Sequence, residues 1–159
     1  MCFVPRQRLT SHVNLTVLVT ALVVTAIDAL TKAWARNTLS AHSVHVFWVL
    51  WLRLQFNPGI SFSMNRSGPI VTTVATAVVA LVVALVALRA RPGPGATGFG
   101  LLIGGGIANV IDRLAASPHE VTDFVAVGNF PVFNLADVAI TLGFAVLLAA
   151  TLRGEKLLS

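Results

Sequence analysis

Four apolar stretches of this 159-residue chain are each long enough to cross a bilayer, and no other feature constrains the fold as strongly. Crossing about 30 Å of hydrocarbon takes about 20 helical residues. Each stretch is expected to be a helix, because lipid offers no partner for an unpaired backbone amide. We therefore predict an all-α membrane protein, a single membrane domain over residues 1–159, with spans near residues 15–34, 69–88, 96–114 and 133–152.

The composition agrees with a membrane protein and excludes other classes. Hydrophobic residues make up 56% of the chain and charged residues 11%, too few charges to cover a soluble globule of this size. The formal net charge is +5, but the basic residues are scattered singly, without a basic patch, so no nucleic-acid partner is expected. The single cysteine, Cys2, forms no internal disulfide.

The basic residues beside the spans predict the orientation. By the positive-inside rule, both termini and the short loop between the second and third spans are expected in the cytoplasm. Residues 35–68 and 115–132 then lie on the outer side. The basic residues behind this prediction are Arg6, Arg8, Arg89, Arg91, Arg153 and Lys156.

The first apolar stretch also has features of a cleavable signal peptide. Its basic start is followed by an apolar run over residues 15–27 and by Ala33-Trp34-Ala35, a small-x-small cleavage pattern. Asp28 and Lys32 would then lie between the apolar run and the cut, which is unusual. We interpret the stretch as a retained span.

Every aspartate of the chain is predicted at the same membrane face. Asp28 and Asp112 lie near the outer ends of the first and third spans, Asp123 lies in the outer loop, and Asp137 lies one turn into the fourth span. Carboxylates at membrane depth are costly and are functional candidates by default.

Structural interpretations are open for the same residues. Asp28 and Lys32 are four apart and form an i,i+4 pair that would anchor a helix end at the membrane surface. Asp112 and Arg113 point about 100° apart, so each is expected to pair with another span or, for Arg113, with a lipid phosphate.

The two remaining aspartates have structural interpretations as well. Asn134 could cap the fourth helix while Asp137 accepts first-turn amide hydrogens. Asp123 could be a solvated loop acid.

The first outer loop contains a predicted strand. Over residues 46–56 the pattern alternates in part, with Trp51, Arg53 and Gln55 opposite the apolar side chains Leu50, Leu52, Leu54 and Phe56. Trp34, Trp48 and Trp51 suit a position at the membrane interface.

Five short motifs, IDALTK, NPGISFS, GGGIANVIDR, VTDF and FNLAD, occur in the order and on the spans typical of one family. With them the chain resembles the lipoprotein signal peptidases, also called signal peptidase II. These are bacterial inner-membrane aspartic proteases that cut the signal peptide from prolipoproteins before a diacylglyceryl-modified cysteine. The resemblance implies four spans with a small β-rich cradle outside the membrane, within residues 35–68, and an active site on the outer side.

The resemblance also assigns roles to residues. The catalytic pair would be Asp123 of VTDF and Asp137 of FNLAD. It implies a lipidated prolipoprotein substrate and contact with membrane lipids. We expect no metal or other cofactor, and we expect a monomer. The residues implied to shape the site are Asn57, Gly59, Asn109, Asp112, Arg113 and Asn134, with Asp28 and Lys32 as the family's first-span pair.

Some positions depart from the usual family pattern. Ala108 stands where Gly is usual, Ile60-Ser61 replace two small residues, and Val138 follows Asp137 where Ser is common. These departures bear on substrate range and leave a catalytically specialised paralogue as an alternative.

Other functions fit the pattern less well. The four histidines, His12, His42, His45 and His119, lack zinc-ligand spacing, and Ser61 and Ser63 lack a nucleophile elbow. A small carrier or scaffold is the non-enzymatic alternative. Carriers place acids near the midplane and show related halves, whereas this chain gathers its acids at one face.

Overall fold

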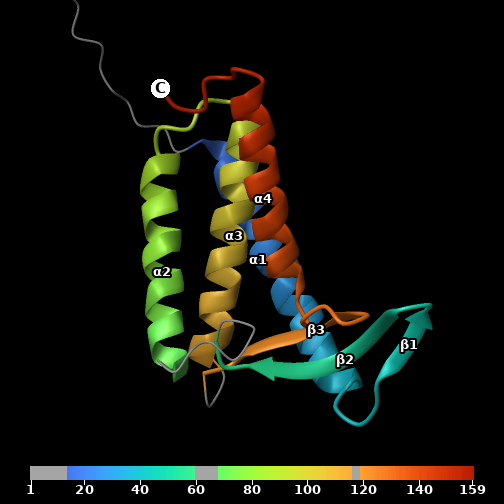
Figure 1. The fold of residues 1–159 in the computed structure, drawn as a ribbon. Helices are drawn as coiled ribbons and strands as arrows, with labels where there is room; N and C mark the ends of the chain where they lie inside the picture. Colours follow the sequence, from blue (N-terminus) through green and yellow to red (C-terminus); the bar gives the residue numbers. More distant parts are fainter. Residues whose placement is uncertain (1–13, 60–67, 116–118) are drawn as a thin grey trace, which may run out of the picture.

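Four long helices and a small sheet form the molecule (Figure 1). The computed structural model describes residues 14–59, 68–115 and 119–159. The helices are α1 Leu15–Thr38, α2 Gly68–Ala87, α3 Pro94–Ala115 and α4 Leu135–Leu152. All four are long and apolar enough to cross a membrane, which confirms the predicted fold class.

Helix α3 is the centre of the bundle. It packs against α1, α2 and α4, and it has the lowest mean hydropathy and the highest buried share of the four. Its glycines permit this position. A Cβ on Gly104 would lie 2.7 Å from the carbonyl oxygen of Ala21 in α1, and one on Gly105 would lie 2.6 Å from that of Ala136 in α4. Small residues of this kind let membrane helices approach at backbone distance.

The strand predicted over residues 46–56 is present only in part, because a turn at residues 48–49 divides this range between two strands of a three-stranded antiparallel sheet. The sheet has the order β1 (Val44–Phe47), β2 (Leu50–Asn57), β3 (Val121–Val127). Figure 1 shows it at the end of the bundle away from the C-terminus. Phe124 of β3 packs against Ala35 and Leu39. This packing explains why α1 runs on to Thr38, past the predicted end at residue 34.

A bulge in β2 makes the predicted alternation of side chains wrong after Leu52. Leu52 pairs with Val125 and Gln55 with Asp123, so β2 carries one residue more than β3 between these pairs. The extra residue reverses the phase of the strand. Phe56 therefore does not share the face of Leu50 and Leu52, whereas Asn57 lies on the face of Asp123.

Candidate active site

Asp123 lies in the middle of β3 and is almost fully buried. Its carboxylate accepts two amide hydrogen bonds, from Asn57 Nδ2 at 3.0 Å and from Asn134 Nδ2 at 2.6 Å. Its exposed fraction is 1%. The interpretation of Asp123 as a solvated loop acid is therefore wrong, because its strand is buried between the bundle and β2.

Asp137 lies in the first turn of α4 and takes part in a capping box. Asp137 Oδ2 accepts from the Asn134 backbone N–H at 3.2 Å, and Asn134 Oδ1 accepts from the Asp137 N–H at 3.0 Å. The capping interpretation is confirmed as geometry. Capping does not account for all of the contacts, because Asp137 Oδ1 also accepts from Asn109 Nδ2 of α3 at 2.9 Å.

One residue, Asn134, joins the two carboxylates. Its side-chain amide donates to Asp123 and its backbone N–H donates to Asp137, so both acids belong to one hydrogen-bonded group. Burial raises the pKa of Asp123 to about 6, and the negative charge of Asp137 adds to this rise. The amides of Asn57 and Asn134 act in the opposite direction, since they stabilise the ionised form.

Lys32 and Asp28 form the predicted ion pair, with Nζ 2.7 Å from Asp28 Oδ2. The expectation that the pair anchors a helix end at the membrane surface is wrong, since each side chain is only 1% exposed. The pair instead reaches the site. Lys32 Nζ donates to Asn109 Oδ1 at 2.8 Å, and Asp28 Oδ1 accepts from the Ala136 N–H at 2.8 Å, beside Asp137.

Asp112 pairs with another span, as predicted. Its carboxylate lies 2.8 Å from the guanidinium of Arg36 and 3.5 Å from Lys32 Nζ, both in α1, and it accepts from the Thr122 N–H at 2.6 Å. Asp112 thus ties α1 to the strand residue that precedes Asp123.

Arg113 is buried, so a pairing with lipid phosphate is wrong. The carboxylates of Asp123, Asp137 and Asp112 act electrostatically on its guanidinium. Within residues 14–59, 68–115 and 119–159, its Nε has no hydrogen-bond partner. Arg113 is therefore a positive charge held beside the aspartate pair.

The remaining predicted residues fall near the site or outside the described chain. The Gly59 N–H donates to Asn57 Oδ1 at 3.0 Å and so orients the amide that meets Asp123. Ala108 is buried in α3, and Ile60-Ser61 lie outside the described residues.

Sequence reasoning missed Arg36 and Thr122. Arg36 donates to both Asp112 Oδ1 and Thr122 Oγ1 at 2.8 Å. A signal for Arg36 was available, because it follows Lys32 by four residues on the same helix face. Thr122 gave no such signal.

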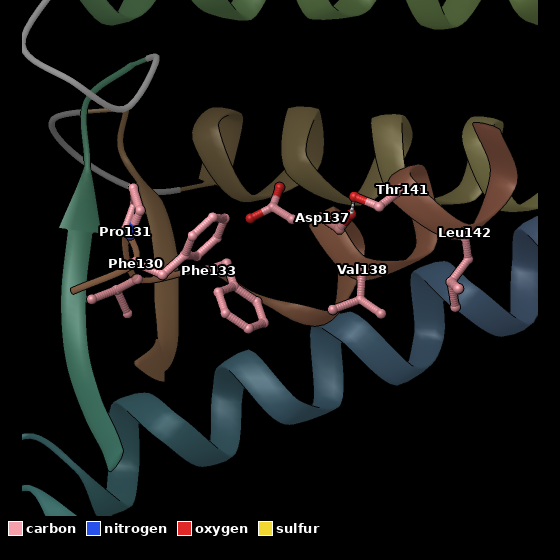
Figure 2. A pocket seen from close by; sticks show the side chains of 8 residues that line it. Phe130, Pro131, Phe133, Asp137, Val138, Thr141 and Leu142 are labelled. Carbon is pink, nitrogen blue, oxygen red and sulfur yellow. Dashed lines mark hydrogen bonds between the residues drawn. The ribbon is translucent and has the colours of Figure 1, made fainter. Parts of the chain in front are cut away.

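A cavity of about 450 Å³ opens beside Asp137 (Figure 2). Its lining is apolar apart from Asp137 and Thr141, and the acid is half-buried rather than sealed. Val138, a position that departs from the family pattern, lines it as well. The other lining residues are Phe130, Pro131, Val132, Phe133 and Leu142. One acid of the pair is thus reachable from a cavity suited to apolar groups, while the other is buried.

This arrangement is suited to acid–base chemistry. Two carboxylates in one hydrogen-bonded group share one proton more readily than they both ionise, so one can serve as acid and the other as base. Among the described residues, no three His, Cys, Asp or Glu side chains gather as a metal site would require.

Comparison with known proteins identifies the family of the chain. Residues 20–153 match the family model of signal peptidase (SPase) II. The chain is 39% identical to the lipoprotein signal peptidase of Gloeobacter violaceus over 150 residues, covering 86% of this chain and 81% of that protein. It is 36% identical to that of Rhodococcus jostii over 156 residues, covering 94% and 79%.

The fold is also similar to a solved bacterial membrane enzyme at 2.3 Å resolution. The TM-score is 0.76 and the identity 25%, over 87% of this chain and 88% of that one. The sequence comparisons and the fold thus agree, and the chain belongs to the signal peptidase II family.

Proposed function

We propose that Asp123 and Asp137 are the catalytic pair with which this bacterial multi-pass membrane protein, a lipoprotein signal peptidase by family, removes signal peptides from prolipoproteins. The observation that carries this proposal is that Asn134 hydrogen-bonds both carboxylates and so places them in one group. Asn57, Asn109 and Arg113 would hold the pair in position and balance its charge. Gly59, Asp28, Lys32 and Asp112 would support these three.

The two acids have different surroundings, which supports different roles. Asp123 is buried and its pKa is raised to about 6, so it is the favoured site of the shared proton. Asp137 reaches the cavity and would take a proton from the attacking water. The protonated acid would hydrogen-bond to the scissile carbonyl oxygen and later help to protonate the leaving amine. These are roles within one hydrogen-bonded group that shares a proton.

We further propose that the aspartates lie at the outer surface of the membrane and that both termini are cytoplasmic. The basic residues at the end remote from the sheet support this orientation. A diacylglyceryl-modified cysteine, held in the outer leaflet by its acyl chains, would then present its scissile bond beside Asp137. The proposed enzyme acts as a monomer, and no nucleic-acid partner is part of the proposal.

Substitution of each aspartate by asparagine tests the assignment. Asparagine at position 137 keeps a side-chain oxygen for the capping box, so a loss of activity there would not be a loss of the cap. Cleavage of a diacylglyceryl-modified prolipoprotein by the purified protein is expected to fall at least about 100-fold in Asp123→Asn and in Asp137→Asn.

The matched control is Glu120→Gln, which removes a carboxylate from the chain just before β3 and is expected to leave cleavage unchanged. Full activity of Asp137→Asn at normal protein level would reduce Asp137 to a capping residue and overturn the assignment. The unlipidated precursor, run in parallel, tests the preference for the lipid-modified substrate.

A further inference from the structure

A second cavity, of about 460 Å³, lies at the β1–β2 hairpin, remote from Asp137. Its polar and aromatic lining residues are Ser43, Trp48, Trp51, Arg53 and Asn129, and Gly128 lines it as well. Trp51 pairs with Ala126, and strand residues alternate between faces, so Trp51 lies on the face opposite Asp123. This cavity is therefore separate from the aspartate pair.

The cavity carries one positive charge and no negative one. Arg53 is exposed, and in the described part of the chain it forms no ion pair. No acidic side chain is among the lining residues, whereas Ser43 and Asn129 add hydrogen-bond donors. A guanidinium with neutral donors beside it matches the geometry of a phosphate, which it binds through two parallel hydrogen bonds.

The rim of the cavity is held in place by the backbone. Trp48 has a φ of 47°, a left-handed conformation that costs energy for a bulky residue. His45 Nε2 donates to the Trp48 carbonyl oxygen at 3.0 Å, and the rings of His45 and Trp51 are 4.3 Å apart. The Gly128 N–H donates to the Val49 carbonyl at 2.9 Å and ties the hairpin to β3. These contacts position Trp48, Trp51 and Gly128 before any ligand binds.

The position and the exposed aromatic side chains of the hairpin suit the level of the lipid headgroups. Figure 1 shows it projecting sideways beyond the helices, so that it overhangs the space beside the bundle. Its turn exposes Phe47 and Trp48, the latter by 85%. Exposed aromatic side chains of membrane proteins concentrate at headgroup level.

We propose that the cavity around Arg53 binds the phosphate of an anionic phospholipid and so docks the hairpin on the leaflet surface. A zwitterionic headgroup would bring a cation that no lining carboxylate balances. This proposal needs the chain to span a bilayer and does not depend on which residues are catalytic.

The hairpin tryptophans report binding directly. In a Trp34→Phe background, fluorescence of Trp48 and Trp51 is titrated with phosphatidylglycerol brominated in its acyl chains, with the protein in detergent. Arg53→Gln is expected to weaken quenching by about five- to tenfold in apparent affinity. Arg153→Gln, which removes an exposed arginine at the other end of the bundle, is the matched control and should leave the titration unchanged.

Three results would overturn the proposal. One is equal affinity in the parent and Arg53→Gln proteins, and another is equal quenching by brominated phosphatidylcholine. The third is competition by inorganic phosphate at concentrations equal to those of the lipid, which would mean a small-anion site. Prolipoprotein cleavage in detergent is expected to be unchanged in Arg53→Gln, which establishes that the variant is folded.

Discussion

Arg36 links β3 to α1 and α3 beside the candidate active site. It donates to Asp112 and to Thr122, and Thr122 is the residue before Asp123. Arg36→Gln removes the guanidinium that donates both hydrogen bonds. The strand that carries Asp123 would then be held less firmly. We expect kcat for prolipoprotein cleavage to fall about tenfold, because small displacements of reacting groups are costly. The loss of unfolding free energy is expected to be only about 1 kcal/mol, since Arg36 is 40% exposed.

Steady-state kinetics and thermal unfolding of Arg36→Gln, Arg36→Lys and Arg153→Gln separate positioning from general damage. Lysine keeps the charge and is expected to restore part of kcat, although it lacks the planar fork. The exposed Arg153 is the control. A change in KM alone, or no rescue by lysine, would argue against a positioning role.

The raised pKa of Asp123 predicts how stability depends on pH. The folded state keeps a proton up to about pH 6, whereas the unfolded chain releases it near pH 4, so the folded state binds more protons between these values. Stability contributed by this group therefore falls as pH rises through that window. Asp123→Asn has no such proton, so its stability relative to the parent should increase by up to about 3 kcal/mol from pH 4 to 6 and then level off.

Unfolding midpoints of the two proteins in detergent, measured across this window, check the prediction. The part of the stability difference that does not change with pH reports the altered hydrogen bonds of the asparagine amide. Parallel curves for the two proteins would therefore show that Asp123 titrates as it does in the unfolded chain.

The contact between α3 and α4 sets where Asp137 lies. A Cβ on Gly105 would meet the Ala136 backbone oxygen at 2.6 Å, and backbone cannot rotate away, so Gly105→Ala must separate the helices beside the aspartate. We expect a loss of about 1–3 kcal/mol in stability together with reduced cleavage.

Gly106→Ala is the matched control one residue further along α3. Its Cβ would face Ala80 Cβ of α2 at 3.1 Å, a contact that relaxes by a small shift, and alanine favours the helix by up to about 1 kcal/mol. Thermal unfolding and prolipoprotein cleavage are measured for both variants and compared. Equal effects would mean that the α3–α4 contact has no special part in placing Asp137.

At the same scale of helices and strands, the sequence predicts most of the fold. Spans follow from apolar length, and the described helices differ from the predicted ones by a few residues. The largest difference is at the end of α1, where packing of Ala35 and Leu39 against Phe124 extends the helix. The bulge in β2 could not be predicted. The alternating pattern of one strand does not show where two of its residues will lie opposite one residue of the partner strand.

At the scale of the whole molecule, the site is built from segments far apart in the chain. The motifs indicate which residues belong to it, but not which of them touch. Asp28, for example, reaches the Ala136 amide across 108 positions of sequence, and only the packing of α1 and α4 against α3 makes this possible. The prediction of Asp28 and Lys32 as a surface anchor failed for this reason, since helical spacing predicts the pair but not its burial.

The sidedness proposed for the molecule rests on its charge distribution and can be tested without reference to catalysis. If both termini are in the cytoplasm, the sheet end places the aspartates at the outer surface. In a Cys2→Ser background, a cysteine at the exposed His42, between α1 and β1, is expected to react with a membrane-impermeant maleimide added to intact spheroplasts. A cysteine at Ser159 should react only after the membrane is permeabilised. The reverse pattern would place the aspartate pair on the cytoplasmic side, where a substrate held in the outer leaflet could not reach Asp137.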